Sequence, residues 1–207
     1  MPPPNQERRP EAADHPHDPT ILPSDLPIPT DDGAADHLEG LRMPSLGLAA
    51  TNGYILHVDR PPPGFARLVV YAYPRTGQPG VAPLTPDWDD IPGARGCTPE
   101  SCGFRDHAME LASAGAAVVG VSTQDTDYQR EAVQRLHLPF PLLSDAEGLL
   151  TSALRLPTFE VAGHVLLKRL TLVIQDGVIE KVFYPVFPPD RHADEVLAWL
   201  RAHPVTH

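Results

Sequence analysis

Residues 96–106 read Gly-Cys-Thr-Pro-Glu-Ser-Cys-Gly-Phe-Arg-Asp and contain both cysteines of the chain. The order is typical of a loop that turns into a helix, because Thr98 can cap the first turn and Pro99 needs no N–H at the first helical position. Glu100 follows in the first turn, where the positive end of a helix favours a carboxylate. Cys97 then lies at the helix N-terminus, where unpaired N–H groups lower the pKa of a thiol. The stretch therefore predicts a nucleophilic thiolate at Cys97.

Two other interpretations of the cysteines must be weighed. A free cysteine is most often a small buried core residue. A metal site would use Cys97, Cys102 and His107, which are evenly spaced. On a helix, however, each five-residue step turns by about 140°, so the three side chains point in different directions around the axis. We therefore expect no metal site, and two neighbouring cysteines at a helix start weigh against a plain core role.

The same residues carry a family resemblance. Gly96-Cys97-Thr98, then Cys102, then Phe104-Arg105-Asp106 resemble the active-site helix of peroxiredoxins. The closest branch is the bacterioferritin comigratory, or Q-type (atypical 2-Cys), group, whose two cysteines also lie five positions apart on one helix. The resemblance extends from about Gly40 to Pro204. It implies that Cys97 attacks the peroxide and that Cys102 resolves the resulting sulfenic acid.

Two buried strands flank the cysteine helix in the predicted fold. Residues 67–73 and 115–122 are continuous β-rich runs, as expected of strands buried on both faces. A helix between them, predicted to end at about Ala114, makes a right-handed crossover with parallel strands. The carboxyl ends of such strands place Tyr73, Cys97 and Ser122 near one edge of the sheet, where ligands bind in this kind of fold.

The remaining elements complete an α/β chain. We expect helices at 127–137, 146–154 and 190–202, a hairpin at 170–183 with an Asp-Gly turn, and an opening β-hairpin at 43–58. Ser144 and Asp145 are interpreted as helix caps and not as catalytic residues. This order predicts a thioredoxin-like fold, with a central mixed sheet flanked by helices and an N-terminal β-hairpin.

The sequence departs from the peroxiredoxin pattern just before Cys97. The family passes from the proline that corresponds to Pro74 to its cysteine in seven residues, with a threonine three before the cysteine. Here an insertion at about 75–92 intervenes, and Ala94 stands three before Cys97. The hydroxyl of the family threonine is therefore missing, and Thr85 or a backbone group is the candidate to replace it. The insertion is a flap over the site or, as we prefer, a plain surface loop.

Arg169 opens the predicted hairpin, ahead of Leu170-Thr171-Leu172. By residue type alone, an arginine at a strand end is a solvated surface residue. In the family, an arginine directly before such a strand reaches the active cysteine. The resemblance therefore implies that Arg169 stabilises the transition state.

The first 38 residues form a proline-rich N-terminal extension, and residues 39–207 form the peroxiredoxin-like domain. Nine prolines before residue 30 leave no room for regular elements. Such a segment buries too little apolar surface to offset its loss of conformational entropy, so we expect a flexible tail. Short patches at Ile21-Leu22 and at Leu26-Pro27-Ile28 leave open an extended strip along the domain.

Composition limits the partners. The chain has 207 residues and a formal net charge of −11, which argues against nucleic acid and against an anionic membrane surface. It contains no apolar run of membrane-spanning length and no apolar signal region. We expect a cytoplasmic protein, in which neighbouring cysteines are more often redox-active than a permanent cross-link.

The resemblance implies an antioxidant thiol peroxidase that reduces hydrogen peroxide and organic hydroperoxides. It implies an intramolecular disulfide, a thioredoxin-like reductant and no cofactor, in a monomer or a homodimer. One rival is a thiol-disulfide oxidoreductase, although that chemistry prefers cysteines three apart, where helical Cα atoms lie about 5 Å from each other. The other is a non-catalytic redox sensor on the same fold, with Ala94 marking lost activity.

Overall fold

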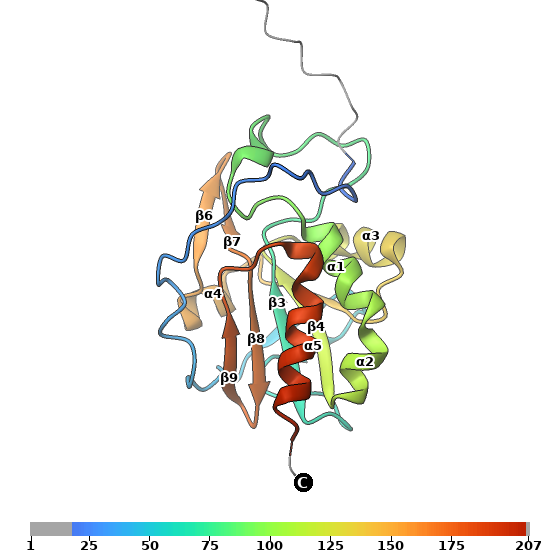
Figure 1. The fold of residues 1–207 in the computed structure, drawn as a ribbon, viewed down its shortest axis with the longest axis vertical. Helices are drawn as coiled ribbons and strands as arrows, with labels where there is room; N and C mark the ends of the chain where they lie inside the picture. The colour runs from blue at the N-terminus through green and yellow to red at the C-terminus, as the bar shows by residue number, and fades with distance from the viewer. Residues whose placement is uncertain (1–17, 206–207) are drawn as a thin grey trace, which may run out of the picture.

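The computed structural model describes residues 18–205, and its centre is a seven-stranded mixed sheet (Figure 1). The strand order is β2-β1-β5-β4-β3-β8-β9. Bounds of the strands are β1 Gly47–Ala50, β2 Ile55–His57, β3 Arg67–Ala72, β4 Ala116–Ser122, β5 Leu142–Ser144, β8 Leu170–Gln175 and β9 Val178–Phe183. A separate hairpin pairs β6 (Thr158–Val161) with β7 (His164–Leu167).

The predicted central strands are confirmed. β3 pairs in parallel with β4 and antiparallel with β8, and all six residues of β3 are buried. Its Leu-Val-Val run suits this position because β-branched side chains pack well on a sheet that is covered on both faces. The thioredoxin-like α/β class follows from this arrangement.

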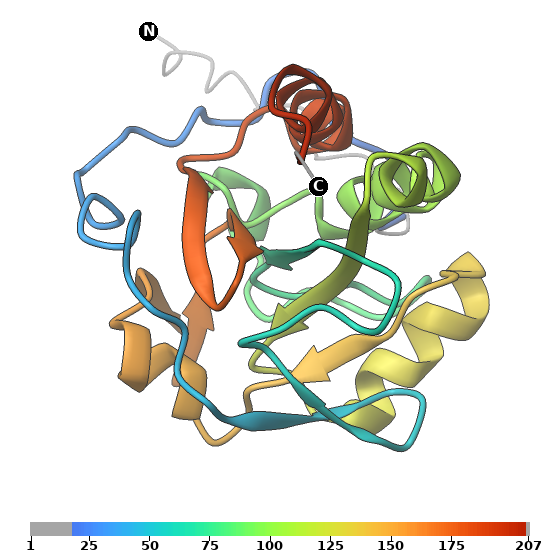
Figure 2. The ribbon, with the colours of Figure 1, turned by 90° about the horizontal axis from the view of Figure 1, so that it is seen from below.

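Helices cover both faces of the sheet. They are α1 Cys97–Asp106, α2 Ala108–Ser113, α3 Thr126–Leu136, α4 Leu149–Leu154 and α5 His192–Ala202, with short 3-10 turns η1 Trp88–Asp90 and η2 Pro189–Arg191. Figure 2 shows α1, α3 and α5 on one side of the sheet and α4 on the other. The two sides correspond to two buried hydrophobic clusters separated by the sheet.

The cysteine helix is shorter than predicted. It leaves helical geometry at His107, with φ −97° and ψ 7°, and resumes as α2. The His107 ring lies 2.6 Å from Glu110 and 2.8 Å from Asp194 on α5, so tertiary contacts hold the break. No local sequence signal marks this position.

The capping prediction is right for Asp145. Its carboxylate accepts from the N–H groups of Leu150 (2.9 Å) and Thr151 (2.8 Å), at the start of α4. Ser144 instead lies in β5 and donates to the carbonyl of Gln124 at 2.7 Å. The predicted Asp-Gly turn forms too, with positive φ at both Asp176 and Gly177.

The described part of the N-terminal extension contains no helix or strand, in line with its prolines. Its contacts differ from those of a tail. Ala35 and Leu38 are buried in the core, and Asp32 contacts Lys168 Nζ at 2.5 Å and Tyr184 Oη at 2.7 Å. Residues 18–38 therefore pack on the domain, whereas residues 1–17 lie outside the described residues. The domain division at residue 38 stays a prediction.

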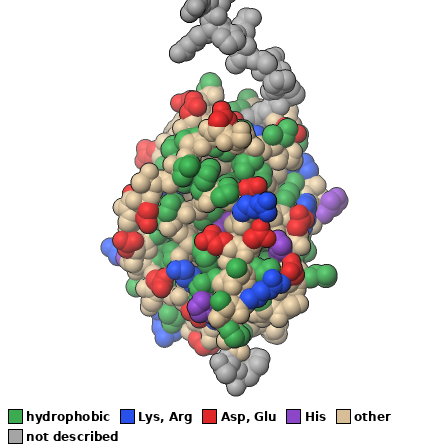
Figure 3. Space-filling view, in the orientation of Figure 1, with side chains coloured by type: hydrophobic (Ala, Val, Ile, Leu, Met, Phe, Trp, Pro, Cys, Tyr) green, Lys and Arg blue, Asp and Glu red, His purple; other side chains and the backbone are tan. Residues whose placement is uncertain are grey.

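No helix within residues 18–205 is long and apolar enough to cross a membrane. On the face drawn in Figure 3, lysine and arginine side chains alternate with aspartate and glutamate and form no continuous basic surface.

Candidate active site

Cys97 is the first residue of α1 and is only 2% exposed. The N-cap position is Gly96, with φ 105°, and a Cβ there would lie 2.3 Å from Pro189 Cγ. Only glycine fits this backbone and this contact. The predicted Thr98 cap is wrong, because Gly96 takes that place and the buried Thr98 hydroxyl has no partner among the described residues.

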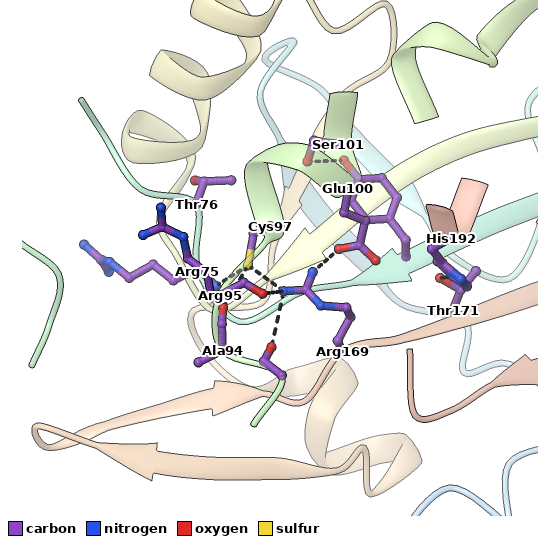
Figure 4. Close-up of polar contacts among 12 residues, drawn as sticks. Arg75, Thr76, Ala94, Arg95, Cys97, Glu100, Ser101, Arg169, Thr171 and His192 are labelled. Carbon is purple, nitrogen blue, oxygen red and sulfur yellow. Dashed lines mark hydrogen bonds and ion pairs between the residues drawn. The ribbon is translucent and has the colours of Figure 1, made fainter. Parts of the chain in front are cut away.

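Two donors reach the sulfur of Cys97 (Figure 4). Arg169 Nη2 lies 3.2 Å from Sγ, and the backbone N–H of Arg75 lies 3.4 Å from it. The thiol itself is within 3.6 Å of the carbonyl of Ala94. Both donors favour the thiolate over the thiol, as required of a nucleophile.

Arg169 is buried and fixed on several acceptors besides the sulfur. Its Nη1 donates to Glu100, and its Nη2 contacts the carbonyls of Gly93 (3.2 Å) and Arg95 (3.0 Å). The implied approach of Arg169 to Cys97 is thus present in the geometry. The interpretation as a solvated surface residue is wrong, since its side chain is 2% exposed.

Glu100 is more than the first-turn acid that the sequence indicates, because it is the counter-ion of Arg169. It is fully buried and comes from the same helix as Cys97. A signal was available in the spacing, because residues three apart on a helix share a face. Glu100 and Cys97 therefore meet the same guanidinium.

The groups around the Cys97 sulfur have opposing effects on the pKa of its thiol. Burial raises the pKa of the Cys97 thiol, and Glu100 acts in the same direction, whereas Arg169 and the Arg75 N–H lower it. The net direction is upward, because the loss of solvation on burial is the largest of these effects and Glu100 adds to it. A lowered pKa, predicted from the helix N-terminus alone, is thus not what this closed geometry gives.

The guanidinium stays charged. Burial acts to lower the pKa of Arg169, but the neighbouring Cys97 and Glu100 outweigh it and hold that pKa above its ordinary value. A permanent positive charge therefore stands 3.2 Å from the sulfur at any working pH.

Cys102 lies on the same helix but is not bonded to Cys97; both thiols are free. Cys102 is half-buried, and burial raises the pKa of its thiol. Five residues of intact helix separate Cα atoms by about 8.7 Å, beyond the reach of a disulfide. The Cys97–Cys102 bond stays a prediction that requires the helix to open.

The missing family threonine is not replaced by Thr85. That hydroxyl donates to Asp87 in an exposed part of the insertion. Thr76 is buried closer by but bonds Gln124 through both its N–H (2.9 Å) and its hydroxyl (3.1 Å). The backbone alternative is the one found, in the N–H of Arg75.

A narrow, partly open cavity of about 30 Å³ lies beside Cys97. Its walls come from the active-site loop, from Tyr128 on α3, from the insertion and from Pro19 of the N-terminal segment. The insertion is more than a surface loop, because its Trp88 is buried in a small cluster with Ala94 and Leu166. Within residues 18–205, no group of three or more His, Cys, Asp or Glu side chains is placed to hold a metal ion.

Known proteins resemble this chain in sequence. The Redoxin family model matches residues 64–197. A Mycobacterium tuberculosis protein named as a peroxiredoxin is 38% identical over 108 residues, which cover 52% of this chain and 70% of that protein. Peroxiredoxin Q of Suaeda salsa chloroplasts is 31% identical over 126 residues, 61% of this chain. The match spans 56% of the length of that plant relative.

Solved structures resemble it in fold. The crystal structure of peroxidoxin BcpB from Mycobacterium tuberculosis has a TM-score of 0.63 and 29% identity, and covers 82% of this chain and 100% of that one. Peroxiredoxin Q of Xanthomonas campestris has a TM-score of 0.59 over 88% of this chain and 100% of that one; at 24% identity it speaks for the fold alone. The chain therefore belongs to the redoxin family and, within it, to the peroxiredoxins.

Proposed function

We propose that the protein is a thiol-dependent peroxidase whose peroxidatic residue is Cys97. The observation that carries the proposal is the sulfur at the start of α1, contacted by Arg169 and by the Arg75 N–H beside a narrow cavity. Such preorganised donors stabilise negative charge that develops on reacting atoms in a dry site.

The first step is attack of the Cys97 thiolate on one peroxide oxygen. The S–O bond forms as the O–O bond breaks, sulfur is oxidised to sulfenic acid, and the leaving oxygen takes a proton to become water or an alcohol. Arg169 is placed to stabilise negative charge on both the attacking sulfur and the departing oxygen. Its Nη2 already contacts the sulfur, and its side chain stays positively charged.

The second step joins Cys102 to the sulfenic acid. A disulfide forms and one water leaves, so the oxidising equivalent of the peroxide is now stored in the S–S bond. Two thiols of a thioredoxin-like protein reduce that bond by exchange and become a disulfide themselves. The cycle needs no metal or organic cofactor.

The setting of this reaction is proposed on general grounds. Two neighbouring cysteines with a redox role are typical of a reducing compartment, which supports a cytoplasmic location. The oligomeric state, a monomer or a homodimer, stays a prediction. Its net charge of −11 disfavours nucleic acid and anionic lipid as partners.

Two single variants test the assignment of the thiols. Cys97→Ser should abolish peroxide consumption, whereas Cys102→Ser should still oxidise once, rapidly, and then stop without an external thiol. Mass spectrometry of the trapped sulfenic acid identifies the oxidised sulfur. A wild-type rate in Cys97→Ser would reject the proposal. A wild type that oxidises once and never turns over with any dithiol reductant would favour a redox sensor.

A further inference from the structure

The N-terminal segment crosses the active site and is held there by Arg95. The Nη2 atom of Arg95 donates to the carbonyls of Asp18 (2.5 Å) and Ile21 (2.9 Å). The backbone carbonyl of the same residue accepts from Arg169, which contacts Cys97 (Figure 4). One residue thus joins this segment to the reacting centre. We call residues 18–32 the strap.

Side chains of the strap lie directly on the active-site loop. Leu22 Cδ1 is 3.1 Å from the position that a Cβ on Gly96 would take, and Pro29 packs at 3.8 Å from the equivalent point on Gly93. Pro19 forms part of the cavity wall beside Cys97. The strap therefore contributes Pro19 to the cavity wall and packs on the loop that carries Cys97, while the insertion supplies most of the remaining wall.

A second anchor lies at the far end of the strap. Asp32 pairs with Lys168 at 2.5 Å and accepts from Tyr184 at 2.7 Å. Lys168 precedes Arg169 in the sequence, so both ends of the strap are tied to residues next to the catalytic machinery. In Figure 1 the strap (blue) and the insertion (teal to green) meet at the end of the molecule where α1 begins.

The size of the space beside Cys97 is the decisive quantity. The cavity there measures about 30 Å³. By this measure one water molecule needs roughly 10–15 Å³, so the space suits a molecule of about two heavy atoms. Hydrogen peroxide has two heavy atoms and is of that size, whereas an aryl or tertiary alkyl hydroperoxide needs several times the volume.

We propose that the strap selects the substrate by size: while its contacts hold, hydrogen peroxide reaches Cys97 and bulky organic hydroperoxides do not. This inference rests on the proposed peroxidase function and narrows its substrate class. If the strap contributed only to stability, loosening it would leave unchanged the ratio between the rate with hydrogen peroxide and the rate with a bulky hydroperoxide.

Two full-length variants loosen the strap in different places. Pro19→Gly combined with Leu22→Ala removes the bulk over the cavity. Asp32→Ala releases the distant anchor and leaves every side chain beside Cys97 in place. Ile28→Ala is the matched control, because Ile28 lies on the strap but is 69% exposed. Urea unfolding of each variant verifies that it is folded.

The measurement is the rate of the first oxidation by hydrogen peroxide and by cumene hydroperoxide, followed by stopped-flow fluorescence. The wild type should prefer hydrogen peroxide, and both loosened variants should cut that preference by about tenfold or more, chiefly through faster reaction with cumene hydroperoxide. The Ile28→Ala variant should keep the wild-type ratio. Equal rates with both peroxides in the wild type, or an unchanged ratio in a folded loosened variant, would overturn the proposal.

Alkylation separates this inference from the peroxidase assignment. In a Cys102→Ser background only Cys97 remains, and iodoacetamide should modify it much faster than a fluorescein maleimide. Loosening the strap should accelerate the bulky reagent selectively. Size-selective alkylation in a protein that consumes no peroxide would reject the proposed function yet support the strap as a size filter. Peroxide consumption without size-selective alkylation would overturn the strap.

Discussion

Arg169 contacts Cys97, which lies 72 residues earlier in the sequence. How firmly the guanidinium is held against the sulfur depends on its other hydrogen-bond partners. A buried guanidinium is costly unless its N–H groups find acceptors. Glu100 supplies the balancing charge, and the carbonyls of Gly93 and Arg95 fix the plane of the fork. The sulfur thus receives a donor whose position is determined before any substrate arrives.

Replacing Arg169 by Met should slow the first oxidation of Cys97 by about 10²-fold, the usual effect of removing one such stabilising donor. Arg130→Met is the control, because that arginine pairs with Asp127 on the exposed face of α3. Stopped-flow rates over a range of peroxide concentrations provide the measurement. A loss below about threefold in a folded Arg169→Met protein would remove Arg169 from the mechanism.

The local sequence places Cys97 and Cys102 on one helix, and the structure confirms that placement. The approach of Arg169 to Cys97 was implied only by the family resemblance, and the catalytic roles of all three residues stay predictions. Sequence reasoning missed the contacts of Glu100 and Arg95 because their partners come from remote segments. Glu100 accepts from Arg169, and Arg95 donates to the carbonyls of residues 18 and 21. Sequence reasoning also missed the raised pKa of the Cys97 thiol, because its largest cause is burial, which depends on segments that are remote in the sequence.

At the scale of elements, the start of α1 is tightly constrained by its neighbours. Gly96 holds a left-handed backbone with φ 105°, against Pro189 on one side and Leu22 of the strap on the other. Helix, strap and η2 converge on a residue without a side chain. Any added atom must displace one of them.

Gly96→Ala should therefore destabilise the protein more than a glycine replacement that meets only backbone strain. Gly40 is the matched control, with φ 84° and no atom within 4 Å of the position that a Cβ would take. Gly40→Ala should lower the free energy of unfolding by about 1–2 kcal/mol, the cost of a left-handed alanine. Gly96→Ala should lose about 1–3 kcal/mol more through overpacking. Urea denaturation measures both, and equal losses would mean that the loop relaxes freely.

Helix α1 must unwind locally before the Cys97–Cys102 disulfide of the proposed cycle can form. Cys97 and Cys102 both lie in α1, which is helical without interruption from the first to the second. Gly103 weakens this stretch, because glycine costs about 1 kcal/mol relative to alanine in a helix. Oxidation should convert residues 97–103 from helix to loop and leave the sheet intact.

Hydrogen exchange on the reduced and the oxidised protein examines this opening. Amide protection should fall around residues 102–105 after peroxide treatment, whereas β3 and β4 should keep theirs. The Cys102→Ser variant, which cannot form the disulfide, should keep its helix protected under the same treatment. A disulfide formed with the helix still protected would contradict the proposed cycle.

Regular elements were predictable where a repeating pattern exists, and irregular ones were not. The β3 and β4 runs, the α3 helix and the Asp176-Gly177 turn match their patterns. The strap has no periodicity, because its prolines exclude regular pairing, and its burial depends on contacts with distant loops. The break at His107 likewise depends on Asp194 of α5.

At the scale of the whole molecule, folding encloses the thiol that the reaction needs. The sheet, α1, the insertion and the strap together leave Cys97 2% exposed, and burial raises the pKa of its thiol. The folded protein therefore holds the Cys97 proton at a pH where the unfolded chain, with a cysteine pKa of about 8.5, has released it. Proton binding and folding are thereby linked.

The sign of this linkage gives a final prediction. A thiol whose pKa is higher in the folded state contributes stability that is complete below the unfolded pKa and is lost as pH rises through the folded pKa. Under reducing conditions, the wild type should lose more unfolding free energy than Cys97→Ser between about pH 8 and about pH 10. Buried Tyr71 and Tyr73, whose pKa values burial also raises, add a similar loss that begins only above about pH 10 and is common to both proteins. Cys102→Ser is the control, because Cys102 is half-buried and should change the slope less. Urea titrations at intervals of half a pH unit measure the three slopes. Parallel slopes for the wild type and Cys97→Ser would mean that folding leaves the pKa of the Cys97 thiol unchanged, and a smaller loss in the wild type would mean that folding lowers that pKa.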